Sequence, residues 1–213
     1  MIIASDLEGT LTTGSSVAGL AKYLQASSDS SGYKRFVRSR LKSYLAAQIG
    51  LQDKQNFRNR WLRDFIQLFE GRSRKDFAEI AEWVVEHELW AKRREDVLAA
   101  IASQNPEKLV LSSGAYTPIL QAFAKRIEAD DVIGTGLEFS ENRLTGKLAG
   151  RINVKNVKAR RLQSYLGDDP LHTAYGDTEA DVPMLKMAEN AVAVYPDKNL
   201  RRTATALGWR VIG

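Results

Sequence analysis

The stretch Asp6-Leu7-Glu8-Gly9-Thr10-Leu11-Thr12 follows the apolar opening Met1-Ile2-Ile3-Ala4 after a single serine. A short apolar run that ends in acidic residues and a Gly-Thr turn predicts a buried parallel strand, with its carboxylates at the carboxyl-terminal edge of a sheet. In open α/β sheets, ligands bind at that edge. We therefore expect the rest of the chain to be organised around this strand.

The chemistry of this stretch depends on its two carboxylates. Asp6 and Glu8 are two residues apart, and alternation along an extended chain points them to the same side. Two like charges this close favour a bound metal, or a division of roles between a nucleophile and an acid. An aspartate can attack phosphorus and form an acyl phosphate while a second carboxyl protonates the leaving oxygen. An ordinary strand end, with Asp and Glu marking a turn, is the alternative.

Length and composition fit one α/β domain with a substantial insertion, because 213 residues with 44% hydrophobic content can bury a real core. The absence of cysteine excludes a disulfide framework and a thiolate metal site, in keeping with the cytosol. We find no apolar run of membrane-spanning length, and Met1 leads into a strand without a basic leader. We expect a soluble, cytoplasmic protein with no membrane partner.

Positive charge is concentrated in one segment of the chain. The net charge is +5, yet twelve Lys and Arg stand against three acids between Tyr33 and Lys75. Such a segment can attract an anionic substrate, a nucleic acid or a membrane surface. A solvated helix surface is the alternative.

Residues 15–96 show the periodicity of successive amphipathic helices. One apolar face contains Val17, Leu20, Ala21 and Leu24, and Ser73 with Asp76 forms a capping box. Three further apolar faces are expected: Phe36, Leu41, Tyr44 and Leu45; Phe57, Trp61, Phe65 and Leu68; Phe77, Ile80, Ala81 and Val84. This pattern predicts a helical insertion after the first strand.

The pattern changes near Lys108 to short apolar runs that alternate with helices. We expect strands at 108–113, 131–135, 172–175, 191–194 and 209–212, helices at 117–126, 155–166 and 197–207, and a β-hairpin at 137–148. Strands that alternate with helices predict an α/β fold with a doubly wound, Rossmann-like parallel sheet as its core.

Four strand or helix ends now carry polar groups of complementary kinds. They are Asp6 with Glu8, Ser112 with Ser113, Lys158 or Lys155, and Asp177 with Asp181. Together they fit phosphoryl transfer, which needs a nucleophile, an acid, donors for phosphate oxygens, a cation and carboxylates for Mg²⁺.

The order of these motifs resembles that of the haloacid dehalogenase (HAD) superfamily, in its phosphoserine-phosphatase-like branch with a helical cap. The motifs are Asp6-Leu7-Glu8-Gly9-Thr10, Leu111-Ser112-Ser113-Gly114, Lys158 within Asn156–Leu162, and Gly176-Asp177 to Asp181. The resemblance implies a catalytic core of residues 1–13 and 97–213, with residues 14–96 as a helical cap inserted after the first motif.

The resemblance also implies a role for each site residue. Asp6 is the expected nucleophile, and Glu8 takes the acid/base place while its backbone carbonyl helps to bind Mg²⁺. Ser112, the amide of Ser113 and Lys158 are expected at the phosphate. Asp6 and Asp177 are expected as ligands of Mg²⁺, with Asp181 supporting through water or the lysine.

Two departures from the family pattern bear on function. Glu8 stands where the family usually has Asp, and Glu also occurs in relatives that pass the phosphoryl group to an alcohol. Thr12 to Ser28 contains no Asp or Glu to meet the ammonium of phosphoserine, so phosphoserine is disfavoured. The basic cap instead suggests a small, polyanionic phosphorylated metabolite: a sugar phosphate, a phosphorylated acid or a nucleotide.

We therefore expect a Mg²⁺-dependent phosphatase that hydrolyses a small phosphomonoester through an aspartyl-phosphate. The alternatives are a phosphotransferase that uses an alcohol as acceptor, and a non-catalytic protein that binds nucleic acid with its basic cap. Intact Asp6, Lys158 and Asp177 argue against the second of these. The sequence sets no oligomeric state.

Overall fold

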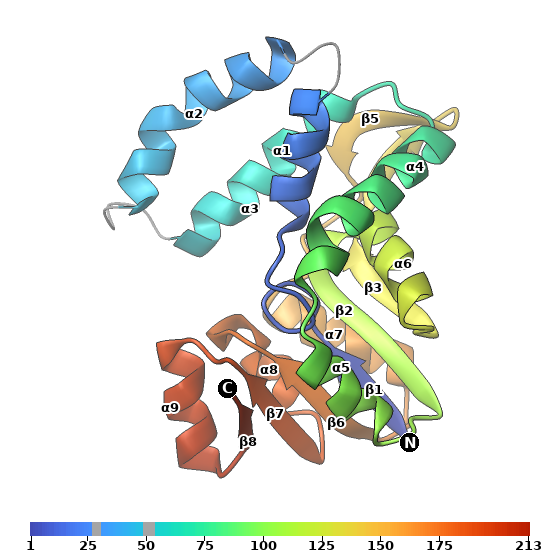
Figure 1. Ribbon diagram of the computed structural model, residues 1–213, viewed down its shortest axis with the longest axis vertical. Helices are drawn as coiled ribbons and strands as arrows, with labels where there is room; N and C mark the ends of the chain where they lie inside the picture. Colours follow the sequence, from blue (N-terminus) through green and yellow to red (C-terminus); the bar gives the residue numbers. More distant parts are fainter. Residues whose placement is uncertain (27–30, 49–53) are drawn as a thin grey trace.

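The computed structural model describes residues 1–26, 31–48 and 54–213, and within 41–48 and 54–58 it describes the backbone alone (Figure 1). Its centre is a six-stranded parallel sheet with the strand order β3-β2-β1-β6-β7-β8. The strands are β1 (Ile2–Ser5), β2 (Lys108–Tyr116), β3 (Asp131–Thr135), β6 (Leu171–Gly176), β7 (Asn190–Val194) and β8 (Arg210–Ile212). The predicted parallel sheet is confirmed.

The topology places a ligand site beside β1. The chain steps from β1 outward to β2 and β3, and then returns to β6, β7 and β8 on the other side of β1. The carboxyl ends of strands at such a reversal leave a crevice between the diverging connections, where ligands bind in open α/β sheets. The first motif follows β1 directly, so the fold puts its carboxylates at this crevice.

Alternation along the strands gives the sheet two buried faces. Ile3 packs into one hydrophobic cluster and Ala4 into the other, and Val192 and Ala193 divide in the same way. The first face is covered by α5 (Glu95–Ala102) and α6 (Thr117–Arg126), and the second by α7 (Asn156–Leu166), α8 (Val182–Leu185) and α9 (Lys198–Leu207). The sheet is therefore doubly wound, as predicted, although α5 was not expected and no bounds were predicted for α8.

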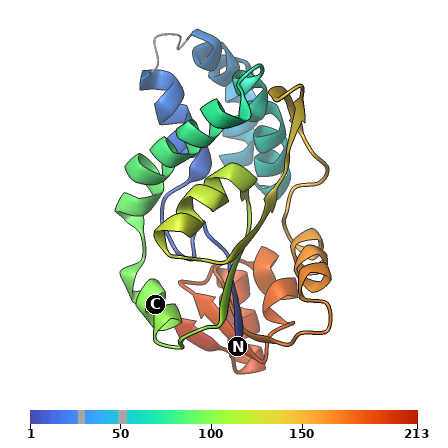
Figure 2. The ribbon, with the colours of Figure 1, turned by 90° about the vertical axis from the view of Figure 1, so that its right-hand side faces the viewer.

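The helices between β1 and α5 gather at one end of the molecule (Figure 1 and Figure 2). They are α1 (Ser16–Ala26), α2 (Ser31–Gln48), α3 (Lys54–Phe65) and α4 (Arg74–Val84), followed by a π-helical turn at Val85–Leu89 and a 3₁₀ turn at Trp90–Lys92. The expected capping box of α4 is present, because Ser73 Oγ accepts from Asp76 N at 3.1 Å and Asp76 Oδ2 accepts from Ser73 N at 3.0 Å. None of the described helices has the length and apolarity of a membrane span.

Most of the predicted apolar faces of these helices are buried. Leu20, Leu24, Phe65 and Phe77 all belong to the first hydrophobic cluster. The predicted side chains of Leu41, Tyr44, Leu45 and Phe57 lie outside the described residues. The burial follows the helical period at most of the described positions, and Val17, which is half-buried and lies in neither cluster, is an exception.

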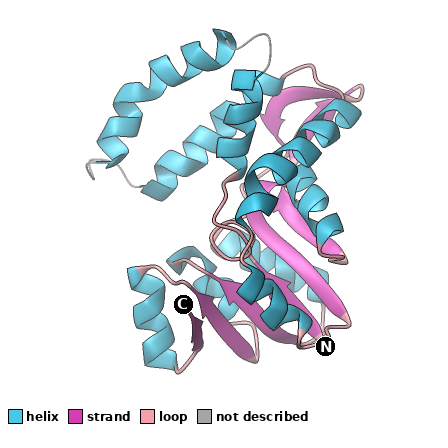
Figure 3. Ribbon diagram, viewed as in Figure 1, coloured by secondary structure: helices cyan, strands magenta, loops and turns pink. Residues whose placement is uncertain are grey.

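A β-hairpin joins the helical region to the sheet. Its strands, β4 (Leu137–Ser140) and β5 (Arg143–Leu148), pair antiparallel, as predicted (Figure 3). Leu144 exchanges backbone hydrogen bonds of 2.8 Å with Gly71 and Arg72, just after the 3₁₀ turn at Ile66–Phe69. The hairpin is therefore hydrogen-bonded to the helical region at the residues that follow this 3₁₀ turn.

The two chain segments that enter and leave the helical region lie side by side. Thr12 and Arg93 form an antiparallel bridge. Thr13 N donates to Lys92 O at 3.0 Å, and Arg94 N donates to Leu11 O at 2.8 Å. The helical region thus departs from and returns to the sheet at one place, next to the end of β1.

Candidate active site

The loop after β1 is shaped by a contact with the loop after β6. Asp6 N donates to Tyr175 O at 3.0 Å, which carries the pairing of β1 and β6 one residue further. Gly9 has a φ of 92°, and a Cβ at this position would lie 2.0 Å from Asp177 Oδ2. Thr10 Oγ1 donates to Asp177 Oδ1 at 3.1 Å. Only glycine fits this turn, and the turn brings the two acidic loops together.

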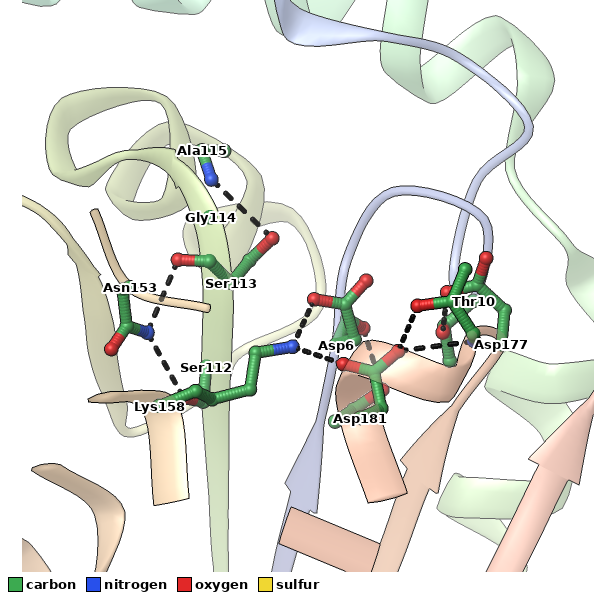
Figure 4. Close-up of polar contacts among 12 residues, drawn as sticks. Asp6, Thr10, Ser112, Ser113, Gly114, Ala115, Asn153, Lys158, Asp177 and Asp181 are labelled. Atoms are coloured by element: carbon green, nitrogen blue, oxygen red, sulfur yellow. Dashed lines mark hydrogen bonds and ion pairs between the residues drawn. The ribbon is translucent and has the colours of Figure 1, made fainter. Parts of the chain in front are cut away.

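A buried lysine bridges two of the predicted carboxylates. Lys158 Nζ donates to Asp6 Oδ1 at 2.6 Å and to Asp181 Oδ1 at 2.5 Å, and all three side chains are buried (Figure 4). Lys155, the competing candidate, precedes α7 with a φ of 52° and is exposed. The geometry favours Lys158, one turn further along the helix, as the central cation.

Asp181 is held so that only one of its oxygens faces the lysine. Thr178 donates to Asp181 Oδ2 through its backbone N at 3.1 Å and through its hydroxyl at 3.0 Å. A Cβ on Gly176 would lie 2.6 Å from the Cβ of Asp181, so the glycine of this motif admits the close approach. Asp181 is therefore a fixed partner of Lys158, as the resemblance implied for a supporting residue.

The site holds more negative charge than its lysine balances. Burial and repulsion from Asp181 and Glu8, opposed by Lys158, raise the pKa of Asp6 to about 6. Burial and repulsion from Asp6 and Asp181 raise the pKa of Asp177 to about 8. Burial alone would lower the pKa of Lys158, but the carboxylates of Asp181 and Asp6 outweigh it and raise that pKa. A further cation would relieve this excess.

The donor set fits Mg²⁺. Asp6, Asp177 and Asp181 can each offer one carboxylate oxygen, and these oxygens lie within 4.8 Å of one another. Hard oxygen ligands from one or two carboxylates, completed by water and phosphate, are what Mg²⁺ prefers. Both oxygens of Asp181 accept hydrogen bonds, from Lys158 and from Thr178, whereas Lys158 contacts only Oδ1 of Asp6, so the carboxylates of Asp6 and Asp177 are the pair best placed for a metal.

Glu8 connects the site to the first helix of the helical region. Its Oε1 accepts from Ser16 N, the first residue of α1, at 2.8 Å. A carboxylate at a helix N-terminus is stabilised by the unpaired amides and the helix dipole. Glu8 also lines the same cavity as Asp6, so its carboxylate connects the loop after β1 with α1.

The structure separates the two predicted phosphate-binding serines. Ser113 lines the cavity, whereas Ser112 is fully buried and its Oγ accepts from Asn153 Nδ2 at 3.3 Å. Neighbouring residues in an extended strand point to opposite sides, so only one of the pair can face the cavity. The prediction placed the Ser112 side chain and the Ser113 amide at the phosphate, but Ser113 is the one of the two that lines the cavity.

Two residues that the sequence analysis did not single out position the site. Asn153 Nδ2 donates to Ile133 O at 2.7 Å and to Ser113 O at 3.2 Å, which ties the ends of β2 and β3 together. Arg94 Nε donates to Gly9 O at 3.1 Å and so supports the loop after β1. Neither residue belongs to a motif, and no periodicity in the sequence indicated them.

These residues surround a cavity of about 590 Å³. One side, which we call the carboxylate floor, consists of Asp6, Glu8, Lys158, Asp177 and Asp181. The opposite side comes from α1, α2 and α3, and its largely apolar surface, which we call the apolar wall, consists of Val17, Ala18, Ala21, Tyr33, Trp61, Leu62 and Phe65, with Ser16 and Asn59 as the polar residues of these helices beside it. The cavity therefore has one charged side and one apolar side.

The chain belongs to the haloacid dehalogenase-like hydrolase family, whose family model matches residues 3–186. The match spans the loop after β1, the end of β2, Lys158 and the loop after β6. The motifs that the sequence analysis linked to this family are thus the ones that the fold brings together.

Comparison with individual proteins gives relatives named as phosphatases. Phosphoserine phosphatase SerB1 of Mycobacterium tuberculosis is 29% identical over 157 residues, covering 70% of this chain and 50% of the relative. Histidinol-phosphatase of Neisseria meningitidis is 33% identical over 117 residues, covering 50% of this chain and 51% of the relative. The chain thus spans about half the length of these relatives.

The fold as a whole recurs in a solved structure. A crystal structure of a protein of unknown function from Bordetella pertussis Tohama I has a TM-score of 0.83 and 19% sequence identity, with 100% of this chain and 97% of that one covered. At this identity the likeness concerns the fold alone.

Proposed function

We propose that the protein is a Mg²⁺-dependent phosphatase that hydrolyses a small phosphomonoester through an aspartyl-phosphate on Asp6. The observation that carries the proposal is the buried bridge from Lys158 to Asp6 and Asp181, at 2.6 and 2.5 Å, beside Asp177 and at the edge of the sheet. Membership of the hydrolase family and the phosphatase names of two relatives support it.

In this proposal the reaction has two steps. A carboxylate oxygen of Asp6 attacks phosphorus in line with the leaving alcohol, the P–O bond to that alcohol breaks, and protonated Glu8 gives its proton to the departing oxygen. Water then attacks the aspartyl-phosphate, Glu8 takes its proton, and inorganic phosphate leaves with Asp6 restored. The cavity supports this division of labour because both carboxylates line it.

Charge stabilisation supplies most of the expected acceleration. The phosphoryl group in transit spreads negative charge over its oxygens, and Lys158 and the Ser113 side of the cavity are the protein groups proposed to meet it. Asp6, Asp177 and the backbone carbonyl of Glu8 are proposed to hold Mg²⁺, which would neutralise phosphate charge when bound. Asp181 keeps the Lys158 ammonium in place through its 2.5 Å contact.

We further propose that residues 1–13 and 97–213 form the catalytic core and residues 14–96 a cap. The paired connections at Thr12 and Arg93 support this division. Val97 and Ile101 of α5 pack in the cluster that includes Ile3 of β1, which supports assigning α5 to the core. The proposed boundary between residues 96 and 97 lies in the first turn of α5, which begins at Glu95.

The test is phosphate release from acetyl phosphate and simple phosphomonoesters, with Mg²⁺ and with EDTA. Asp6→Asn should lower kcat by at least about a thousandfold, because the nucleophile is lost while the side chain keeps its shape. Asp168→Asn makes the same change at an exposed position after α7 and should leave turnover unchanged. Turnover retained by folded Asp6→Asn would remove Asp6 from the proposed role.

The same assay separates hydrolysis from transfer to an alcohol. With added glycerol, a hydrolase releases as much phosphate as substrate consumed. A phosphotransferase would instead release less phosphate and form glycerol phosphate in the missing amount.

A further inference from the structure

The cavity is much larger than the group that reacts in it. A volume of about 590 Å³ lies within the range that holds a whole small-molecule ligand, whereas a phosphoryl group fills only a small part of it. The remaining volume extends from the carboxylate floor to the apolar wall. What the wall presents therefore selects the rest of the substrate.

We propose, on the basis of the phosphatase function above, that the leaving alcohol of the substrate is uncharged and predominantly apolar and packs against the apolar wall. The substrate class is thus a phosphomonoester of a hydrophobic alcohol, with a carbon chain or ring long enough to reach α1 and α3. The phosphate end lies on the carboxylate floor.

The aromatic residues of the wall form a packed cluster. The Tyr33 and Phe65 rings meet edge to face at 6.3 Å, and those of Trp61 and Phe65 stack at 6.3 Å. Phe36 contacts the Trp61 ring edge-on from behind at 5.0 Å. Phe65 is fully buried, while Tyr33 and Trp61 are partly exposed beside the cavity. A fixed aromatic surface of this kind stabilises apolar groups through area and ring contacts.

The basic residues of the same helices lie elsewhere. Lys34, Arg35, Arg38, Arg60 and Arg63 are exposed, and none of them lines the cavity. Among the described side chains, therefore, α1, α2 and α3 bring no Lys or Arg to the cavity. The sequence-based expectation that the basic segment meets a polyanionic substrate does not match this arrangement.

Arg40 shows why the number of basic residues in this segment does not predict the charge at the cavity. Its guanidinium forms an ion pair with Asp64 at 2.9 Å and lies 4.1 Å from the centre of the Phe36 ring. Its charge supports the packing behind the wall. It is not directed at the cavity.

A charged leaving group would meet little compensation at the wall. An ammonium or carboxylate moved from water to an apolar surface loses hydration, and this is costly unless a partner is supplied. Lys158 is already engaged by two carboxylates, and Lys155, the other lysine that lines the cavity, is exposed to water and does not belong to the wall. Phosphoserine and histidinol phosphate, which carry an ammonium beside the phosphate, should accordingly be poor substrates.

The test compares three esters of the same primary alcohol type, which differ only at the far end of a six-carbon chain. They are hexyl phosphate, 6-aminohexyl phosphate and 6-(phosphonooxy)hexanoate, each assayed for kcat/KM with Mg²⁺. We expect hexyl phosphate to exceed both charged esters by at least about tenfold, because only its end group matches the wall. 2-Phenylethyl phosphate should match hexyl phosphate or exceed it.

Each outcome bears on one proposal. Equal or higher kcat/KM for a charged ester overturns the inference, and preference for the carboxylate would point to Lys155. If acetyl phosphate is hydrolysed with Mg²⁺ through Asp6 while hexyl phosphate is not preferred, the phosphatase function stands and the inference fails. If none of the compounds is hydrolysed by folded protein, the phosphatase function itself fails.

A charge placed on the wall gives an independent test. Val17→Arg should shift the kcat/KM ratio of the carboxylate ester to hexyl phosphate by at least about tenfold toward the carboxylate. Gln25→Arg adds the same charge to α1 at an exposed position away from the cavity and should leave the ratio unchanged. Should Val17→Arg fail to fold, Ala18→Arg tests the same wall from an exposed lining position. An unchanged ratio in a folded wall variant overturns the proposal.

Discussion

The carboxylate floor and the apolar wall face each other across one cavity, yet they are built in opposite ways. On the floor, side chains are fixed by charged hydrogen bonds such as the two from Lys158. On the wall, they are fixed by ring contacts such as those of Phe65 with Tyr33 and Trp61. The floor comes from the loops after β1 and β6 together with Lys158 of α7, and the wall comes from the inserted helices. Charge arrangement thus serves the proposed chemistry, and shape and apolarity serve the proposed selection of substrate.

This division predicts different effects of mutation. A change on the floor should alter the turnover of every ester to the same degree, because each presents the same phosphoryl group. A change on the wall should alter the ratio between esters. The three predictions that follow probe this contrast at the floor, at the link between the two sides, and at the metal.

The largest effect is expected for Lys158→Met. The substitution keeps much of the side-chain volume but removes the ammonium that pairs with Asp6 and Asp181. We expect kcat/KM to fall by at least about a thousandfold, roughly 4 kcal/mol of transition-state stabilisation, for charged and uncharged esters alike. The free energy of unfolding should also fall by about 3 kcal/mol, because two buried carboxylates lose their partner.

Lys186→Met is the matched control, since it removes an exposed lysine after α8. Steady-state kinetics on the same three esters and chemical denaturation provide the measurements. A preserved rate, or a loss confined to one ester, would contradict the assignment of Lys158 to the common chemistry.

A smaller effect is expected for Glu8→Asp. Shortening the side chain withdraws the carboxylate from Ser16 N, which it now meets at 2.8 Å, and so displaces the proposed acid. We expect kcat/KM to fall by about tenfold, or about 1.4 kcal/mol. Glu8→Gln keeps the length and the ability to accept from Ser16 N but cannot donate the proton as an acid, so it should cost more. A higher rate in Glu8→Asp would show that the longer side chain does not serve the reaction.

The smallest effect concerns pH, metal and stability. The folded-state pKa of Asp177 is raised from 3.8 to about 8, so the folded protein binds this proton more tightly than the unfolded chain does. Without metal, the contribution of this group to stability is therefore present at low pH and is lost as the pH rises toward 8. Mg²⁺ should offset that loss by pairing with the ionised carboxylates.

Thermal unfolding at pH 5 and pH 8, with EDTA or with Mg²⁺, measures this effect. We expect Mg²⁺ to raise the Tm by at least about 2 °C more at pH 8 than at pH 5. Asp177→Asn should remove most of that difference, because its side chain does not titrate. An equal Mg²⁺ effect at both pH values would contradict the coupling.

Much of the fold was predictable from local signals in the sequence. The strand at 131–135 was predicted with the bounds that the structure shows, and the capping box at Ser73 marked the start of α4. Apolar runs that end in turn residues define such elements without knowledge of the tertiary structure. The bounds of the short helix α8 were not predicted, since Val182–Leu185 is too short to show a helical period.

The residues of the candidate site were predictable where a sequence motif identified them. They were not predictable where the direction of a side chain determines whether it faces the cavity. Asp6, Lys158, Asp177 and Asp181 meet as the motifs suggested. Ser112 and Ser113 are neighbours of the same type, and only the register of β2 decides which of them faces the cavity. The wall was not predictable for a related reason: composition counts the basic residues of a helix, whereas packing determines which face meets the cavity.

The adjacent anchor points of the helical region, at Thr12 and Arg93, give it the topology of a long surface loop. An inserted segment whose two ends lie side by side can gain or lose helical turns without separating β1 from β2. The entropic cost of closing such a segment grows only slowly with its length. Insertion, deletion and repacking beyond these two points can therefore change the proposed substrate selection without displacing the carboxylate floor.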